Sequence, residues 1–399
     1  QRALPNEAER TLIERVFGIG GKSLWEDGKH VIQRVEDLPD STKDLPIPAK
    51  DPAPPPPHPN QAPGSSDNPS SAWAHLDAAL ERMAAWRDDP ASGRTRPALD
   101  DKVITAWTAL AVTGLVKAGR IMGQTPWIDR ASKAGSWLCH GARLPHAPER
   151  LCRTLGNDLE GFAEDYAFTI EALIELHQTT MDVTWRHEAR ALMATAIDRF
   201  MDLDGGGVAG FWFTPNNGEA LFARYQGTDD GVMPSANAVM AHNLWRLGWG
   251  CDIPAWRNMA LALTRHHLLN TTHLSQAGRW ARAWRDMSPT YATLGLAAPN
   301  QDAARDALQT WWKEGRAMGG VWVEAVWPGA TDIPGWMDGK EATSTGEVRW
   351  FVCVEGSCGL PCASPAEAMA QWAALCGGDR GRASQPDSTH ASDSTHPAP

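Results

Sequence analysis

The 399-residue sequence is poor in tyrosine and phenylalanine, has no excess of basic residues and contains no long hydrophobic run. Its formal net charge is −11, which excludes the positive surface needed for nonspecific binding to nucleic acid or anionic lipid. No apolar run approaches the roughly 20 residues that cross a bilayer, so no membrane association is expected. The 7 scattered cysteines exclude a dense disulfide framework and indicate reduced thiols in a cytoplasmic protein.

Tryptophan is the unusual aromatic residue, with 20 Trp against 3 Tyr and 8 Phe. Tryptophan rings can stack on the apolar C–H faces of sugars. Alternatively, the excess reflects a compositional drift in which Trp fills core positions. Composition alone leaves both interpretations open.

The two ends of the chain differ from its middle. The sequence begins at Gln1 without Met or an apolar signal segment, as if cut from a longer protein. Eleven prolines in 39–70 predict an extended or disordered linker after an N-terminal segment, 1–38. The tail, 377–399, repeats Asp-Ser-Thr-His and is also expected to be disordered.

Apolar side chains recur at steps of three and four residues along much of the sequence, which predicts amphipathic helices. Four such stripes occupy 73–86, 104–122, 162–177 and 236–247. Second helices are expected near 127–140, 183–201 and 255–270. Helix pairs repeated in this way indicate a helical array or an (α/α) toroid over 71–289.

The last third of the sequence predicts a small α/β unit over 290–376. Strands are expected at 291–297, 320–326 and 348–354, with helices at 301–316 and 365–375. The fold class is therefore mainly α, a partial (α/α) toroid of helical hairpins with a small C-terminal α/β unit.

Polar residues stand at the starts of three striped helices. They are Asp100-Asp101-Lys102, the 161–166 segment with Glu164, Asp165 and Tyr166, and the 229–237 segment with Asp230, Ser235 and Asn237. Such residues often only cap helices. If the striped helices run the same way around a toroid, however, their starts meet at one mouth. Because adjacent helical residues point about 100° apart, one of Glu164 and Asp165 is expected to be structural.

The order of these motifs resembles the thioredoxin-domain-containing proteins related to spermatogenesis-associated protein. The likeness rests on Trp25 to Lys29, Asp100 to Trp107, Gly161 to Ala167, Asp230 to Asn237, and Phe351 to Cys353 with Cys358. It implies a toroid like those of six-hairpin glycosidases and N-acylglucosamine epimerases, and a link to carbohydrate metabolism. The family's thioredoxin-like domain and first hairpins have no counterpart in the sequence, which leaves about four hairpins of six.

The first hypothesis is a carbohydrate-related protein that acts on a sugar by acid/base chemistry. The proposed proton-transfer residues are Glu164, Asp101 and Asp230, and the proposed sugar-binding residues are Lys102, Trp107, Arg153, Asp165, Tyr166, Trp212, Arg224, Ser235 and Asn237. Trp212 and Arg224 belong to an expected hairpin, 211–213 with 221–224, above the mouth. The alternatives are a non-catalytic interaction or redox-associated module and an inactive fragment.

Neither a cofactor nor a metal is expected, and a saccharide is the expected ligand. His242 lies on a striped helix without a clear catalytic partner, so a core or rim position is expected. Cys353 and Cys358 could form a disulfide or redox pair, or they could be structural thiols. Metal binding is disfavoured because no second cysteine pair of similar spacing exists.

Overall fold

The computed structural model describes residues 4, 6–17, 71–93, 95, 98–202, 210–218, 222–314, 320–341 and 346–377. The chain forms two compact units, Gln1–Asp101 and Lys102–Pro399. The predicted linker, 39–70, and the tail after residue 377 lie outside the described residues. The boundary between the units follows Asp101, whereas the sequence predicts a toroid that begins at residue 71.

The first unit is a pair of helices with a small core. It contains α1 (Glu7–Phe17), α2 (Ser71–Asp88) and the 3-10 helix η3 (Pro90–Ser92). Leu12 of α1 and Leu76 of α2 belong to the same apolar cluster, and Glu9 forms an ion pair with Arg82. The stripe at 73–86 is thus a helix as predicted, and it belongs to the first unit, where it pairs with α1.

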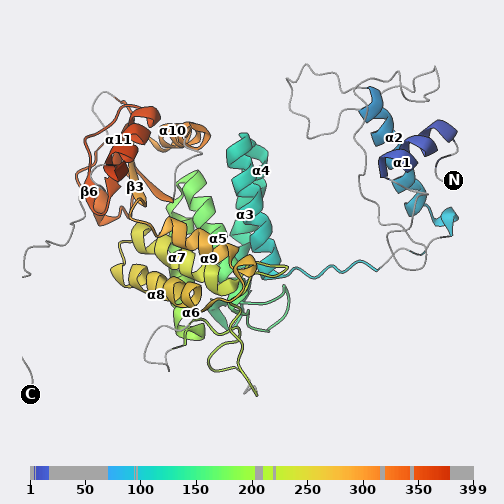
Figure 1. Ribbon diagram of the computed structural model, residues 1–399, viewed down its shortest axis with the longest axis horizontal. Helices are drawn as coiled ribbons and strands as arrows, with labels where there is room; N and C mark the ends of the chain where they lie inside the picture. Colours follow the sequence, from blue (N-terminus) through green and yellow to red (C-terminus); the bar gives the residue numbers. More distant parts are fainter. Residues whose placement is uncertain are drawn as a thin grey trace, which may run out of the picture. The chain divides into compact units, whose positions relative to one another are not determined.

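The second unit contains three helical hairpins in its described part. They are α3 (Thr105–Met122) with α4 (Thr125–His140), α5 (Ala163–Thr180) with α6 (Val183–Phe200), and α7 (Ala236–Gly250) with α8 (Pro254–Asn270). The first helices of the hairpins lie side by side, with α5 between α3 and α7, and each packs against its own second helix (Figure 1). This arrangement confirms a partial (α/α) toroid, with three described hairpins instead of four.

Each hairpin turns through a residue in the left-handed backbone region. Gly123 (φ 67°) follows α3, Met181 (φ 55°) follows α5, and Asp252 (φ 52°) lies between α7 and α8. Only glycine adopts this conformation without a steric penalty. The same turn geometry thus reverses the chain in all three hairpins, although the residue types differ.

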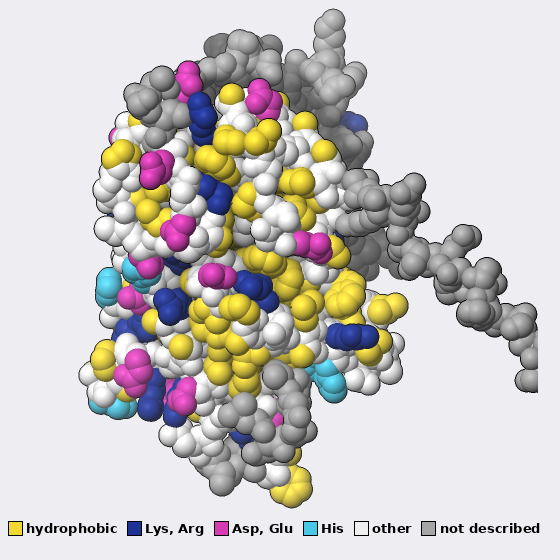
Figure 2. Space-filling model, turned by 90° about the vertical axis from the view of Figure 1, so that its left-hand side faces the viewer, with side chains coloured by type: hydrophobic (Ala, Val, Ile, Leu, Met, Phe, Trp, Pro, Cys, Tyr) yellow, Lys and Arg dark blue, Asp and Glu magenta, His cyan; other side chains and the backbone are white. Residues whose placement is uncertain are grey.

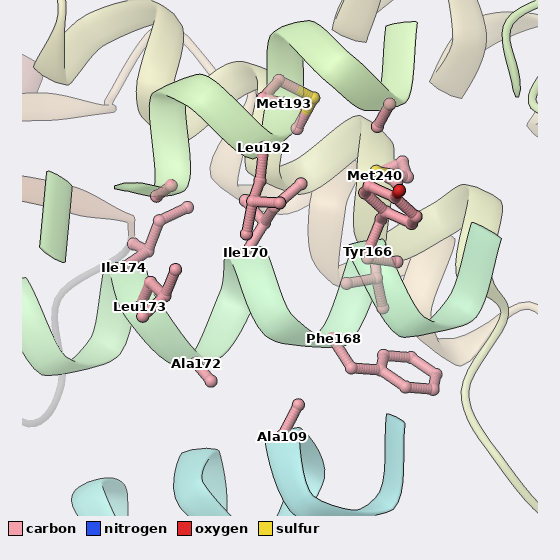
Figure 3. Packing of buried hydrophobic residues seen from close by; sticks show 14 of the residues in the cluster. Ala109, Tyr166, Phe168, Ile170, Ala172, Leu173, Ile174, Leu192, Met193 and Met240 are labelled. Atoms are coloured by element: carbon pink, nitrogen blue, oxygen red, sulfur yellow. The ribbon is translucent and has the colours of Figure 1, made fainter. Parts of the chain in front are cut away.

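Helix α5 forms the centre of the toroid core. All of its residues except Thr180 are buried. Phe168 points towards Ala109 of α3, whereas Ile170 points to the opposite side, towards Leu192 of α6 (Figure 3). The apolar stripe at 162–177 thus marks only one of the faces that α5 buries, and its polar residues are buried as well.

A four-stranded sheet forms the predicted C-terminal α/β unit. Its strands are β3 (Ala292–Ala297), β4 (Val321–Val326), β5 (Arg349–Val354) and β6 (Ser357–Cys358), in the order β4-β3-β5-β6. Helix α10 (Gln301–Glu314) connects the parallel strands β3 and β4, and α11 (Pro365–Gly377) packs on β5. Trp311 of α10 stacks on Trp350 and Trp372, so these tryptophans fill the core.

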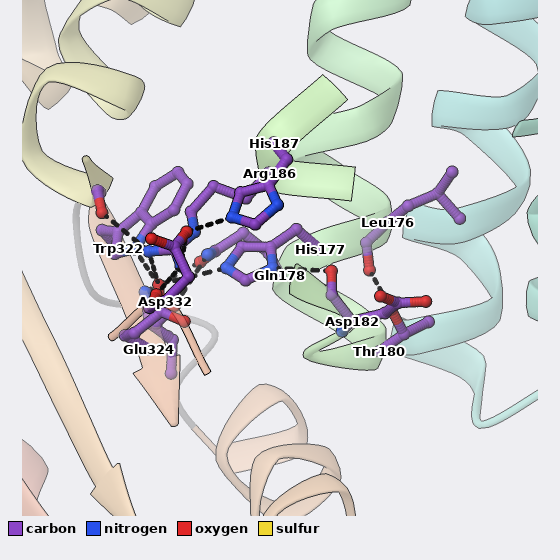
Figure 4. Close-up of polar contacts among 12 residues, drawn as sticks. Leu176, His177, Gln178, Thr180, Asp182, Arg186, His187, Trp322, Glu324 and Asp332 are labelled. Atoms are coloured by element: carbon purple, nitrogen blue, oxygen red, sulfur yellow. Dashed lines mark hydrogen bonds and ion pairs between the residues drawn. The ribbon is translucent and has the colours of Figure 1, made fainter. Parts of the chain in front are cut away.

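Buried polar contacts attach the sheet to the toroid (Figure 4). The side-chain amide of Gln178 on α5 donates to Val323 O (2.8 Å) and accepts from Val323 N (2.9 Å) on the edge strand β4. The carboxylate of Glu324 accepts from Arg186 Nη1 at 3.2 Å and lies 3.3 Å from His177 Nε2. The Gln178 contacts satisfy backbone groups of the edge strand β4, and the Glu324 contacts add buried charge pairs between the sheet and the toroid.

Some elements differ from the sequence expectations. The sequence did not predict the hairpin of β1 (Arg143–Leu144) and β2 (Ala147–Leu151), the helix α9 (Gly278–Asp286), or the 3-10 helices η4 (Leu274–Gln276) and η5 (Gly335–Met337). Conversely, the described residues of 211–213 and 222–224 form no strand pair; Phe211 instead bridges to Met201. In the part of the chain that the structure describes, every helix is too short or too polar to span a membrane.

Candidate functional site

The starts of α3 and α5 are joined by the carboxylate of Asp165. Its Oδ1 accepts a hydrogen bond from Ala106 N of α3 (2.9 Å), and its Oδ2 accepts one from Phe162 N (2.8 Å). The side chain is fully buried. Burial raises the pKa of Asp165 to about 6, despite the opposing effect of Arg153 and the two amides. Asp165 is therefore the structural member of the adjacent acidic pair, not a sugar ligand.

Arg153 and Glu164 form the polar centre of this end of the toroid. Arg153 Nη1 donates to Glu164 Oε1 (2.6 Å) and lies 3.1 Å from Asp165 Oδ1. The Arg153 carbonyl accepts from Thr105 N, which fixes this segment to the start of α3. The exposed fractions of the Arg153 and Glu164 side chains are 18% and 11%, so both groups are mostly covered and only a small part of each is accessible.

The start of α7 is held by residues that the sequence assigned to catalysis or sugar binding. Asp230 accepts from Ser235 N (2.8 Å) through Oδ1 and from Arg279 N (2.7 Å) through Oδ2. The Ser235 hydroxyl accepts from Ala238 N and donates to Gly227 O, which makes it the N-cap of α7. Ser235 thus caps α7 and Asp230 binds amides at the starts of α7 and α9, while the roles of Asp230 in proton transfer and of Ser235 in sugar binding stay predictions.

Asn237 and Tyr166 are also structural. Asn237 is buried and makes two hydrogen bonds to the backbone of Phe211, with Oδ1 accepting (2.6 Å) and Nδ2 donating (2.9 Å). Tyr166 is fully buried, packs against Phe200 and accepts from Leu151 N (3.0 Å). Neither side chain has a surface left for a ligand, so the prediction that they bind sugar hydroxyls is wrong.

A row of aromatic side chains runs from Arg153 across the start of α5. The Arg153 guanidinium lies 5.3 Å from the ring centre of Phe162, Phe162 stacks on Phe213 (4.8 Å), and Phe213 lies 6.1 Å from Tyr225. Backbone hydrogen bonds link the same segments, because Ala163 N donates to Phe213 O and Phe213 N donates to Tyr225 O. Tyr225 is 64% exposed and forms the outer end of the row.

Two further tryptophans lie close to these helix starts. Trp107, on the first turn of α3, is 57% exposed and follows the Ala106 amide that Asp165 binds. Trp212 is half-buried beneath the guanidinium of Arg224, 4.7 Å away. Arg224 is held by Thr214 O and Asn216 Oδ1. Trp107 thus lies at the start of α3, and Arg153 pairs with Glu164 at the start of α5, whereas Trp212 and Arg224 pair with each other.

The remaining predicted residues lie at the boundary between the units. Asp101 is the exposed last residue of the first unit, and Lys102 is the exposed first residue of the second. Their roles in proton transfer and sugar binding stay predictions.

The sequence interpretation missed a buried charge network deeper in the toroid. Glu171 and Glu175 of α5 are 3% and 2% exposed and are contacted by cations from α3, α7 and α9. Lys117, Arg279 and other cations lower the pKa of Glu171 to about 2, although burial alone would raise it. Glu171 and Glu175 follow Glu164 by seven and eleven residues, so the three carboxylates lie on one face of α5. This spacing could have indicated the charge network from the sequence.

His242 occupies a buried position, as expected. Its Nε2 lies 3.0 Å from Asp286 Oδ2 of α9. Burial lowers the pKa of His242 to about 4, and the neighbouring Asp286 only partly opposes this shift. Asp286 in turn has a pKa of about 2, because the contacts with His242 and Arg285 outweigh its burial.

Cys353 and Cys358 form a disulfide between the neighbouring strands β5 and β6. This resolves the alternatives left open by the sequence in favour of a disulfide. Cys139 and Cys152 are buried free thiols, and burial raises the pKa of Cys139 to about 12, which makes it unreactive. Within the described ranges, no three or more His, Cys, Asp or Glu side chains are placed to hold a metal ion.

Comparisons with known proteins give partial similarities. No family model matches the chain. The chain is similar to Spermatogenesis-associated protein 20 of Homo sapiens, with 34% identity over 199 residues that cover 47% of this chain and 24% of that protein. The protein of the same name from Rattus norvegicus is 32% identical over 185 residues, which cover 44% and 23% of the respective chains. The chain thus matches about a quarter of the length of these relatives.

Two solved structures share a distant likeness. One is a GH76 α-mannanase of Bacteroides thetaiotaomicron, with a TM-score of 0.39 and 12% identity over 60% of this chain and 68% of that chain. The other is an inactive variant of an α-1,6-mannanase of Salegentibacter sp. in complex with α-1,6-mannotriose, with a TM-score of 0.37 and 10% identity over 54% and 64% of the respective chains. The chain is therefore similar to Spermatogenesis-associated protein 20 over less than half of its own length.

Proposed function

We propose that the second unit binds a saccharide across the starts of its inner helices. The observation that supports this function is the aromatic row beside the Arg153–Glu164 pair. Charged groups that are partly accessible next to exposed rings suit a ligand that has both hydroxyls and apolar C–H faces. Arg153 and Glu164 would bind hydroxyls, while Trp107 and Tyr225 would stack on sugar rings.

The geometry favours binding over hydrolysis by two carboxylates. Glycoside hydrolysis generally needs two carboxyl groups on opposite sides of the scissile bond. Both oxygens of Asp230 are bound by backbone amides, and Asp165 is buried. Glu164 remains as the acid/base candidate in this unit, so turnover, if it occurs, would depend on it.

Binding can be tested by titrating the protein with a panel of neutral and acidic oligosaccharides while following tryptophan fluorescence and heat release. At least one saccharide should bind. Trp107→Ala and Tyr225→Ala should each weaken its binding by about tenfold, because each removes a stacking surface. Trp284→Ala is the matched control, since Trp284 of α9 is 49% exposed but is not among the side chains gathered at the starts of α3 and α5.

The role of Glu164 can be tested separately. Glu164→Gln keeps the size of the side chain but removes the charge that pairs with Arg153. If the protein turns over the bound saccharide, this variant should lose turnover while retaining the wild-type fold by circular dichroism. Absence of binding across the panel would contradict the proposed function. It would favour the alternative interpretation, a non-catalytic interaction module. Equal affinity of the Trp107 and Trp284 variants would contradict the location of the site.

A further inference from the structure

The inner face of the toroid carries more cations than its two buried carboxylates can neutralise. Five basic side chains surround Glu171 and Glu175, and we call them the inner cationic cluster: Lys117 and Arg120 of α3, Arg246 of α7, and Arg279 and Arg282 of α9. They come from three helices that are far apart in the sequence but meet around α5.

Both carboxylates form ion pairs with cations of the cluster. Glu171 contacts Lys117 Nζ (3.2 Å) through Oε1 and Arg279 Nη2 (3.0 Å) through Oε2. Glu175 contacts Arg246 Nη1 (2.9 Å) through Oε1 and Arg120 Nη2 (3.2 Å) through Oε2. Each carboxylate oxygen therefore lies within ion-pair distance of at least one cation, and Glu175 Oε1 also lies 3.5 Å from Lys117 Nζ.

Arg282 makes the excess of positive charge clear. It lies one turn after Arg279 on α9, on the same side of the helix. Among the described residues it forms no ion pair, although it interacts electrostatically with Glu171, Glu175 and the neighbouring arginines. Burial and the nearby Arg279 lower its pKa, which indicates that its charge is not fully compensated. Five basic side chains of the cluster thus face the two carboxylates of Glu171 and Glu175.

The cations lie between the carboxylates and the solvent. The side chains of Lys117, Arg279 and Arg120 are 24%, 18% and 12% exposed, whereas Glu171 and Glu175 are almost completely covered. Part of each of these three cationic side chains is thus accessible from solution. On the face of the molecule in Figure 2, by contrast, Lys and Arg side chains are interspersed with Asp and Glu. A concentrated positive site is exceptional for a chain with a net charge of −11.

We propose that the inner cationic cluster binds an oxyanion, the carboxylate or phosphate group of an acidic saccharide. An oxyanion would accept charge-assisted hydrogen bonds from the guanidinium groups and relieve their mutual repulsion. Glu164 and Glu171 lie two turns apart on one face of α5, about 10 Å along the helix, so one ligand can reach both regions. The saccharide part rests on the proposed function, whereas the oxyanion site does not.

The oxyanion site can be tested with inorganic phosphate and sulfate as probes. Thermal unfolding of the full chain is measured at constant ionic strength, with chloride as the reference, because salt alone screens the cluster. Phosphate and sulfate should raise the melting temperature above its value in chloride, in a saturable manner. Glucuronate and glucose 6-phosphate should raise the melting temperature at lower concentration. The compound whose effect saturates at the lower concentration shows whether the site prefers a carboxylate or a phosphate group. Melting temperatures identical to those in chloride would overturn the proposal.

The variant Arg282→Gln tests the location of the oxyanion site. This variant should bind phosphate about tenfold more weakly, because a charge-assisted contact is lost. It should also be at least as stable as the wild type in chloride, since a repulsive charge has been removed. Arg265→Gln is the matched control, because Arg265 is an exposed arginine of α8. Equal phosphate affinity of the Arg282 variant and the wild type would overturn the assignment. Phosphate binding without saccharide binding would refute the proposed function alone.

Discussion

Asp165 of α5 accepts a hydrogen bond from the amide of Ala106 on α3 at 2.9 Å, so that one carboxylate caps the starts of two inner helices. The same carboxylate contacts Arg153, which in turn holds Glu164. The helix caps and the candidate site are therefore one continuous network. Changes in Asp165 should affect both the fold and the position of Arg153.

Asp165→Ala should lower the free energy of unfolding by about 3 kcal/mol, because it leaves two helix-start amides and a cation without their buried acceptor. Urea denaturation followed by circular dichroism measures the loss. Asp158→Ala is the control: Asp158 is exposed, and its removal should change stability by less than about 0.5 kcal/mol. Similar losses in the two variants would show that Asp165 is not a structural cap.

His242 should make the protein less stable in mild acid. Its pKa is about 4 in the folded state, below the ordinary value of 6.5, so the folded protein binds fewer protons than the unfolded chain between these pH values. Its contribution is therefore complete above pH 6.5 and declines as the pH falls towards 4, by about 3 kcal/mol in total. Asp286, with its pKa of about 2, adds a separate loss at still lower pH.

The measurement is a series of urea denaturation curves between pH 4.5 and 7.5, a range of about 3 units around the ordinary histidine pKa. His242→Gln should flatten the dependence of stability on pH in this range. His140→Gln is the control, because His140 is exposed at the end of α4. A pH dependence unchanged by His242→Gln would mean that other groups cause the acid sensitivity.

Gly250 should be intolerant of a side chain. A Cβ atom at this position would lie 2.2 Å from the ring of Trp322, which is fully buried in β4. Gly250→Ala should therefore cost about 2 kcal/mol through overpacking between the toroid and the sheet. Gly114→Ala is the contrasting control in α3, because nothing lies within 4 Å of its added methyl group. It should stabilise the helix by about 0.5–1 kcal/mol, and the two melting temperatures should move in opposite directions.

The Cys353–Cys358 disulfide should contribute little to overall stability. The two residues are 5 positions apart, so the bond closes a very short loop and removes little entropy from the unfolded chain, worth about 2 kcal/mol at most. The double variant Cys353→Ser with Cys358→Ser should remain folded. Reductant should lower the melting temperature of the wild type only slightly and should leave that of the double variant unchanged. A collapse of the sheet on reduction would contradict this expectation.

The sequence was sufficient to locate most elements. Apolar steps of three and four residues predicted α3, α5 and α7, and short runs of Val, Leu and Trp predicted β3, β4 and β5, all close to their observed bounds. The order of these elements indicated helical hairpins followed by a sheet unit. Helix α9 escaped prediction because only 9 residues form it and arginines separate its apolar positions.

The roles of the polar residues could not be predicted in the same way. A carboxylate at a helix start looks the same in the sequence whether it caps an amide or faces a ligand. Asp230 proved to bind amides of Ser235 and Arg279, while Glu164 is largely buried and forms an ion pair with Arg153. The partners are 49 residues apart in the case of Asp230 and Arg279, so only packing brings them together.

The sequence by itself determined where most of the long helices and the main strands form, because local periodicity and turn residues depend on near neighbours along the chain. The tertiary structure alone decided which carboxylates are buried caps, which face solvent, and which cations converge on Glu171 and Glu175. Burial and charge pairing depend on residues that approach only after the helices pack, and a hydrogen bond between two elements exists only when both are in place.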